Sequence, residues 1–164
     1  MIYKNLKVTA VIIALIIAAV TALIGIEYFK SYTLTLQDGN SGKIYGEYKI
    51  KENQEFSVGF IHSVNKSPVT DFFTVKHGKI FVTKTIYYGF GAGVQTEIEE
   101  GQTLSYGDDG SMIVTGFNKE IPRLSYIVGT VSDHILKIND KEISLRDLCG
   151  KNANICFRVS KSLF

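Results

Sequence analysis

The chain has 164 residues, of which 45% are hydrophobic and 21% charged, and its formal net charge is +2. Lys4 and Lys7 are two of its 18 basic residues and precede an apolar segment, so the other 16 balance the 16 acidic residues of the remaining chain. This neutral balance, without a run of basic residues, argues against nucleic acid and anionic lipid surfaces as partners. About 130 residues follow the apolar segment, which is enough for one domain with its own core.

The first predicted element is a membrane-spanning helix over residues 8–26. This segment, VTAVIIALIIAAVTALIGI, has 19 residues and no charge, and as a helix it would span about 28 Å, enough to cross a bilayer. Lys4 and Lys7 precede it, whereas the following Lys30 is offset by Glu27. The positive-inside rule therefore predicts a single-pass cell-membrane protein with a cytoplasmic N-terminus and the rest of the chain outside.

A cleaved signal peptide is the alternative interpretation of the same segment, because a basic start followed by an apolar stretch fits one as well. The apolar run is long for a signal peptide, and no small-x-small cleavage site followed by a polar start closes it. We therefore expect two parts: a cytoplasmic start with the membrane anchor (1–30) and an extracytoplasmic β domain (31–164).

The β domain is predicted from short alternating segments rich in Val, Ile, Thr, Tyr and Phe, separated by turn residues. Strands this short, at spacings near ten residues, are typical of an antiparallel β-sandwich or a partly closed barrel. We expect an all-β fold of about nine to ten strands and almost no helix. The predicted turns are Asp38-Gly39-Asn40, Glu52-Asn53, Asn65 to Pro68, His77-Gly78, Gly107 to Gly110 and Asn139-Asp140.

A hairpin over residues 56–76 carries the first candidate site. His62 continues the alternating apolar face of Phe56, Val58 and Phe60, whereas Ser63 points to the other face. Neighbours on a strand point apart, so this geometry argues against a nucleophilic Ser-His pair and a serine hydrolase.

The expected register places three ionisable residues in a row. A four-residue loop over 65–68 would set His62 opposite Asp71, and a two-residue loop at His77-Gly78 would set Asp71 opposite Lys84. One interpretation is structural, because His62, Asp71 and Lys84 would satisfy one another within or at the rim of the core. The other is a pocket for a ligand or partner. One His and one carboxylate are too few for a metal site, so we expect no metal and no cofactor.

Three glycines follow in the segment Tyr88 to Gly93. Phe90, Gly91 and Gly93 form a second candidate site, because a glycine-rich backbone can approach an anionic group closely. No helix is predicted after it, so a nucleotide-binding loop is not supported, and a tight corner between sheets is the alternative.

Two cysteines near the C-terminus, Cys149 and Cys156, are a disulfide candidate. In an oxidising compartment they could bridge the ends of the loop between them. The alternatives are two buried free thiols or half of a metal site, and the metal site is the less favoured because the spacing is not CxxC and no His lies nearby.

The segment Phe60 to Val64, followed by Pro68-Val69 and Asp71 and then by Phe90 to Gly93, resembles the HSV…PV…(E/D) and (F/Y)GAG signatures of a bacterial family, domain of unknown function 1850. Further similarity lies at Gly116-Phe117, Ile121-Pro122, Leu124 and Asp133-His134. The resemblance implies a small exported or membrane-anchored β protein, often encoded beside the membrane subunits of TAXI-type TRAP transporters. It implies no catalytic residues, so His62, Ser63, Pro68, Asp71 and the glycines are motif positions without known roles.

The first functional hypothesis is a non-enzymatic accessory or interaction module for a transport system, with transporter membrane subunits as partners. The second is a small-ligand-binding domain that uses the region of His62 and Asp71. The third is an envelope hydrolase.

Overall fold

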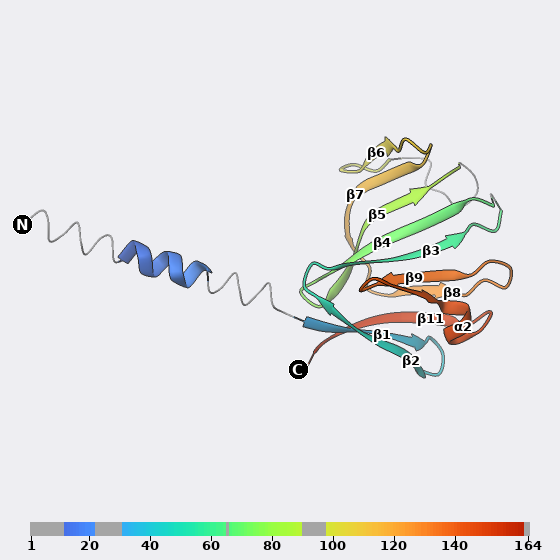
Figure 1. The fold of residues 1–164 in the computed structure, drawn as a ribbon, viewed down its shortest axis with the longest axis horizontal. Helices are drawn as coiled ribbons and strands as arrows, with labels where there is room; N and C mark the ends of the chain where they lie inside the picture. The colour runs from blue at the N-terminus through green and yellow to red at the C-terminus, as the bar shows by residue number, and fades with distance from the viewer. Residues whose placement is uncertain (1–11, 22–30, 65, 90–97, 163–164) are drawn as a thin grey trace, which may run out of the picture. The chain divides into compact units, whose positions relative to one another are not determined.

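The computed structural model describes residues 12–21, 31–64, 66–89 and 98–162. The chain divides into two units, residues 1–30 and 31–164 (Figure 1). In the first unit, residues 12–21 form a helix with exposed side chains, and the rest of the predicted segment 8–26 lies outside the described residues. No helix among the described residues has the length and apolarity needed to cross a membrane.

The second unit is the predicted all-β antiparallel fold, arranged as two sheets. The small sheet has the order β2-β1-β11-β8, with bounds β1 Ser31–Asp38, β2 Ile44–Lys51, β8 Leu124–Ile127 and β11 Asn154–Lys161. The large sheet has the order β10-β9-β3-β4-β5-β7-β6, with bounds β3 Glu55–Ile61, β4 Pro68–Lys76, β5 Lys79–Tyr87, β6 Thr103–Tyr106, β7 Met112–Glu120, β9 His134–Ile138 and β10 Lys141–Ser144.

The described part of the β domain therefore contains eleven strands, where nine or ten were expected, and neither sheet closes into a barrel. Three of the eleven strands, β6, β8 and β10, have only four residues each. Strands this short give weak alternation in the sequence, which explains the difference in number.

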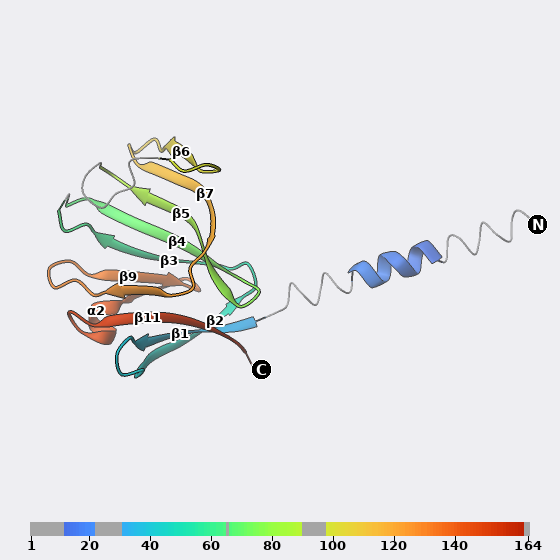
Figure 2. The same ribbon diagram turned by 180° about the vertical axis from the view of Figure 1, so that it is seen from behind.

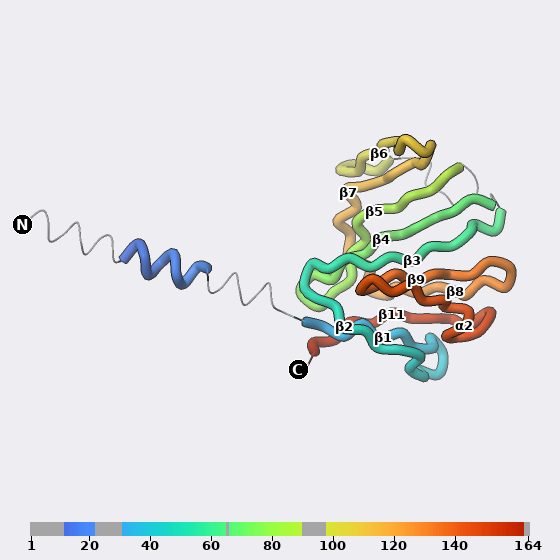
Figure 3. Tube along the Cα trace, viewed as in Figure 1, coloured from blue at the N-terminus to red at the C-terminus, as the bar shows by residue number. Residues whose placement is uncertain are grey.

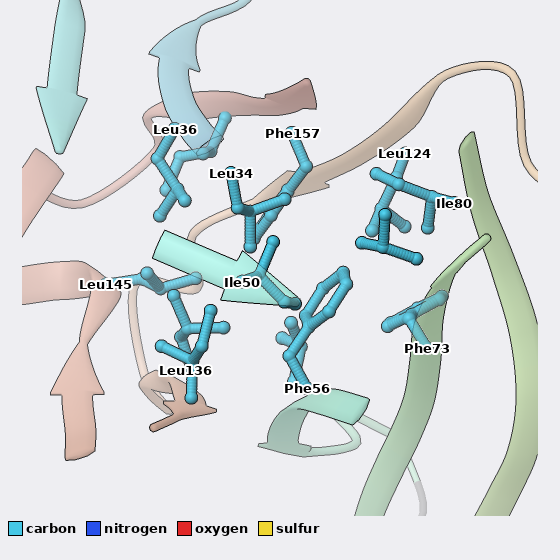
Figure 4. Close-up of a cluster of buried hydrophobic side chains, with 14 of the residues drawn as sticks. Leu34, Leu36, Ile50, Phe56, Phe73, Ile80, Leu124, Leu136, Leu145 and Phe157 are labelled. Atoms are coloured by element: carbon cyan, nitrogen blue, oxygen red, sulfur yellow. The ribbon is translucent and has the colours of Figure 1, made fainter. Parts of the chain in front are cut away.

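The core lies between the two sheets and is built by alternation along the strands. Tyr32, Leu34 and Leu36 point inward from β1 and are buried. From the large sheet, Phe56 stacks on Phe73 with ring centroids 5.3 Å apart (Figure 4). Burying one such side chain contributes about 1.5 to 3 kcal/mol, so this interior stabilises the sandwich.

Residue type sets the turns at His77-Gly78 and Asn139-Asp140 as predicted, whereas the turn predicted at Asn65 to Pro68 is displaced, because β4 already begins at Pro68 and Asn65 lies outside the described residues. His77 and Gly78 form the two-residue loop between β4 and β5, and both have positive φ angles, 51° and 74°. Asn139 and Asp140 do the same between β9 and β10, with φ angles of 51° and 59°. Such angles match the twist of a hairpin, which is why Asn, Asp, His and Gly occur here.

One short helix, α2 (Leu145–Cys149), follows β10. Ser144 caps its N-terminus, because the Ser144 side chain accepts a hydrogen bond from the Asp147 backbone N–H. Leu145 is buried in the core and fixes the helix to the sandwich.

The strand registers define two opposite ends of the β domain. One end holds the turn after β1, the loops after β3, β5 and β8, and α2, and it lies on the right in Figure 1 and on the left in Figure 2. The other end holds the turns after β2, β4 and β9 and the first residue of β1. The chain path can be followed from end to end in the trace of Figure 3.

Candidate functional site

Asp71 on β4 is half-buried, and His62 is not its partner. Its cross-strand neighbour on β3 is Val58, whereas the expected register required His62. The predicted His62–Asp71 pair is therefore wrong.

The hydrophobic pattern explains this error. The expected and observed registers both place Phe56 and Phe73 on the core face, because they differ by an even number of residues. In the observed register Phe56 lies directly opposite Phe73, and their rings stack. Pro68 begins β4, where its missing N–H costs no ladder bond, and the loop between the strands is longer than the four residues expected.

Lys84 is not opposite Asp71 either, although the predicted two-residue loop at His77-Gly78 is confirmed. The pairing of β4 with β5 shifts between Phe72 and Phe73, so Asp71 faces Thr85 and Lys84 faces Phe72. Such a bulge turns the following side chains to the opposite face. Lys84 accordingly lies on the outer face, with Nζ 3.8 Å from the centre of the Phe72 ring.

The true partners of Asp71 are two hydroxyl groups. Oδ1 accepts a hydrogen bond from Thr85 Oγ1 at 2.9 Å, and Oδ2 accepts one from the Tyr126 hydroxyl at 2.8 Å. Because Tyr126 belongs to β8 and Asp71 to β4, this second bond joins the small sheet to the large sheet.

Burial raises the pKa of Asp71 above its ordinary value, and the hydrogen bonds from Tyr126 and Thr85 oppose this shift. Burial, followed by the nearby charge of Asp71, raises the pKa of the Tyr126 hydroxyl. Tyr126 therefore stays protonated and acts as a donor. With both carboxylate oxygens engaged, the arrangement is typical of a structural polar contact between sheets.

His134 lies beside this contact. Its ring stacks on Phe60 at 4.9 Å and lies 5.7 Å from the Tyr126 ring. Burial lowers the pKa of His134, an effect that the charge of Asp133 opposes. Gly129 N–H donates a hydrogen bond to His134 Nδ1 at 3.3 Å, which holds the ring in the core as a neutral acceptor.

Asp133 organises the loop after β8. Its carboxylate accepts hydrogen bonds from the Ser144 hydroxyl, the Arg146 backbone N–H and the His134 backbone N–H. Arg146 also donates to the Gly129 carbonyl at 3.3 Å. Asp133 thus joins this loop to the start of α2.

The motif residues His62, Ser63 and Pro68 lie in or beside the loop after β3. His62 is half-buried, its backbone N–H donates to the Ser67 carbonyl, and Ser63 and Pro68 are exposed. Phe90, Gly91 and Gly93 lie outside the described residues. The structure therefore separates His62 and Ser63 at this end from Asp71 in the interior.

Cys149 and Cys156 are free thiols in the structure, not the disulfide that their spacing allows. Ile155 and Phe157 point into the core from β11, so the intervening Cys156 points to the outer face. Cys149 instead packs against the core cluster from α2. The two side chains therefore lie on different sides of the small sheet.

The end of the domain that carries the motif loop is unusually apolar, and we call it the apolar end. Among the described residues of the β domain, eight large hydrophobic side chains are exposed, and seven of them lie here: Ile44, Ile61, Val64, Tyr88, Tyr106, Ile127 and Val131. Val131 is 87% exposed and Ile127 68%. The Ser132 hydroxyl donates to the Ile61 carbonyl at 2.9 Å, which keeps the loops after β3 and β8 together.

Tyr126 and Thr85 were missed by the sequence analysis, and His134 entered it only through the family resemblance. His134, Leu136 and Ile138 alternate inward along β9, and this pattern could have placed His134 on the core face. Nothing local could have paired Tyr126 with Asp71, because the two residues are 55 positions apart and in different sheets.

Comparison with known proteins gives one result. No curated protein and no solved structure matches the chain. A family model, "Domain of unknown function (DUF1850)", matches residues 56–145, which run from β3 to the first residue of α2. The match covers more than half of the 164 residues and contains the motif loop and, apart from Glu55, all seven strands of the large sheet. The chain therefore belongs to the DUF1850 family.

Proposed function

We propose that this protein is a non-enzymatic interaction module that docks another protein through its apolar end. The observation that carries this proposal is the concentration of exposed large hydrophobic side chains at one end of the sandwich, which holds seven of the eight in the described part of the β domain. Single exposed hydrophobic residues are common on soluble proteins, but several gathered at one end are typical of an interaction surface.

The position of the motif residues supports the same proposal. The loop after β3 holds His62 and Ser63, which lie between the exposed residues Ile61 and Val64. Pro68 follows this loop as the first residue of β4. Family residues at the surface of a loop are better suited to a partner than to packing. The half-buried Asp71, with both oxygens engaged by hydroxyls, offers little to a small ligand in its present contacts.

We propose further that the module is anchored in the cell membrane by residues 8–26, acts outside the cytoplasm, and serves a TAXI-type TRAP transporter. The 19-residue uncharged segment and the basic residues before it support the anchor. The family resemblance supports the transporter membrane subunit as the partner.

The experiment is affinity purification of the tagged full chain from membranes, with identification of co-purified transporter membrane subunits. The double variant Ile127→Asp/Val131→Asp places one charge at the last residue of β8 and one in the loop that follows. It should abolish the enrichment of the transporter subunit. Ile98→Asp is the matched control, because Ile98 is the one exposed hydrophobic residue of the eight outside the apolar end.

Equal recovery of a transporter subunit by all three proteins would contradict docking through the apolar end. Failure of the wild type to enrich any transporter subunit would contradict the proposed partner.

The membrane anchor has its own test. The protein should stay in the membrane fraction at high salt, and its intact mass should include Met1 to Ile26. A mass without this segment would contradict retention.

A further inference from the structure

A groove crosses the outer face of the large sheet along β3. Phe56 and Val58 point into the core, so Ser57 and Gly59 point to the outer face. Two cavities of about 480 Å³ and 390 Å³ open over this strand, and Lys137 and Glu142 line both. The two cavities are therefore parts of one elongated depression.

The depression exists because its floor has small side chains. Gly59 lies between Thr70 on β4 and Ile135 on β9 in the sheet, and Ser57 lies beside Lys137. A Cβ atom at Gly59 would come within 3.2 Å of Thr70 Oγ1, so even the smallest side chain would begin to fill the space.

The chemistry of the groove changes along its length. Near the apolar end its walls are the hydrophobic residues Ile61, Pro68 and Ile135. Toward the opposite end it is lined by three carboxylate residues, Glu55, Asp140 and Glu142.

The residues that line the groove carry a net negative charge, although the chain after Lys7 is neutral overall. The lining residues include four carboxylates, those three and Asp133, against the two lysines Lys137 and Lys141. Lys137 is already paired with Glu142 at 2.6 Å, and both side chains are more than half exposed. Such a pair is weak and can exchange partners at little cost.

We propose that this groove binds an extended segment of another protein, hydrophobic at one end and basic at the other. The outward positions of β3 from Glu55 to Ile61 span about 20 Å, the length of an extended segment of about six residues. Alternate side chains of such a segment would point into the groove, where apolar ones meet Ile61 and Ile135 and basic ones meet the carboxylates. Of the seven exposed residues of the apolar end only Ile61 lines this groove, and the proposal holds whether or not that end docks a transporter.

The probe is the peptide LTVTKTK-amide with fluorescein on its N-terminus, which places two apolar and two basic residues at alternate positions. Anisotropy titration of the purified full chain in detergent should show saturable binding, and a peptide with both lysines replaced by glutamate should bind at least about tenfold more weakly. Glu142→Lys should weaken binding of the lysine peptide by about tenfold. Glu100→Lys, the same charge change at an exposed residue that does not line the groove, should leave it unchanged.

Gly59→Val tests the floor of the groove, because a β-branched side chain suits a strand but occupies the space. Binding should be lost while the circular dichroism of the folded domain is retained. If this variant does not fold, the comparison of Glu142→Lys with Glu100→Lys decides. Equal weakening by both charge variants, wild-type affinity in folded Gly59→Val, or no saturable binding by the wild type would each overturn the proposal.

Discussion

The two ends of the β domain differ in how they use their side chains. At the end opposite the apolar end, which we call the charged end, the turns are hydrogen-bonded to one another. The buried carboxylate of Glu52 accepts the His77 backbone N–H through both oxygens, at 2.9 and 3.1 Å. Gln54 donates to Asn139, and Asn139 donates to the Lys49 carbonyl.

At the apolar end, by contrast, the loop that holds Val131 presents this side chain to water. Hydrogen bonds through Ser132 and Asp133 also join the loops of the apolar end, but there large hydrophobic side chains stay exposed, and we propose that they form the binding surface. Exposed apolar area costs free energy until a partner covers it, at about 25 cal/mol per Å². Substitutions at the two ends should therefore affect different properties.

Glu52→Ala should cause the largest loss of stability. It removes the buried carboxylate that accepts the His77 N–H through both oxygens, at a cost of about 2 to 3 kcal/mol. Val131→Asp at the apolar end should change the free energy of unfolding by less than about 0.5 kcal/mol. Denaturant unfolding of the two variants measures both values. A Glu52→Ala protein as stable as the wild type would remove the distinction between the ends.

Substitutions in the Asp71–Tyr126 contact between the sheets should cause the next largest loss of stability. Tyr126→Phe removes one hydrogen bond to a half-buried carboxylate and should cost about 2 kcal/mol. Asp71→Ala and Tyr126→Phe should be non-additive in a double-mutant cycle, because the two groups are in contact. Asp71→Ala and His62→Ala should instead add within about 0.5 kcal/mol. Strong coupling of His62 to Asp71 would contradict the observed register.

Ionisation of Asp71 should change the free energy of unfolding with pH, by less than the substitutions above. Its pKa is raised in the folded state, so its contribution to stability is complete below the unfolded pKa of about 3.9 and is lost as the pH rises through the folded pKa. Asp71→Asn cannot ionise and should lack this loss. The test is the difference in unfolding free energy between the two proteins across the acid range. A difference that does not change with pH would contradict the raised pKa.

The two thiols should have the smallest effect. Because they are free, a reducing agent should leave both electrophoretic mobility and stability unchanged. Burial raises the pKa of Cys149 to about 11, so alkylation near pH 8 should be slow in the native protein and fast after unfolding. A mobility shift on reduction would show that a disulfide forms after all.

Much of the fold was predictable because turn residues and alternation act locally. Asn139-Asp140 and His77-Gly78 require positive φ angles, and residues of these types supply them. The same alternation placed Phe56 and Phe73 correctly on the core face. It fixes only the face of a strand, however, so a register error of an even number of residues passed undetected.

The candidate site was predicted less well, because its geometry depends on contacts that are distant in sequence. The bulge beside Phe72 has no signal in the sequence, and it moved Lys84 to the outer face. Tyr126 reaches Asp71 only because the two sheets pack face to face. The apolar end likewise appears only when loops from β3, β5 and β8 are brought together by the strand registers.

Photocrosslinking in membranes tests the binding role of the apolar end most directly. Benzoylphenylalanine would be placed at Val131 in one full-length protein and at His77, an exposed turn residue of the charged end, in another. We predict a crosslink from position 131 to a transporter membrane subunit and none from position 77. Crosslinks of equal yield from both positions, or from position 77 alone, would contradict docking through the apolar end.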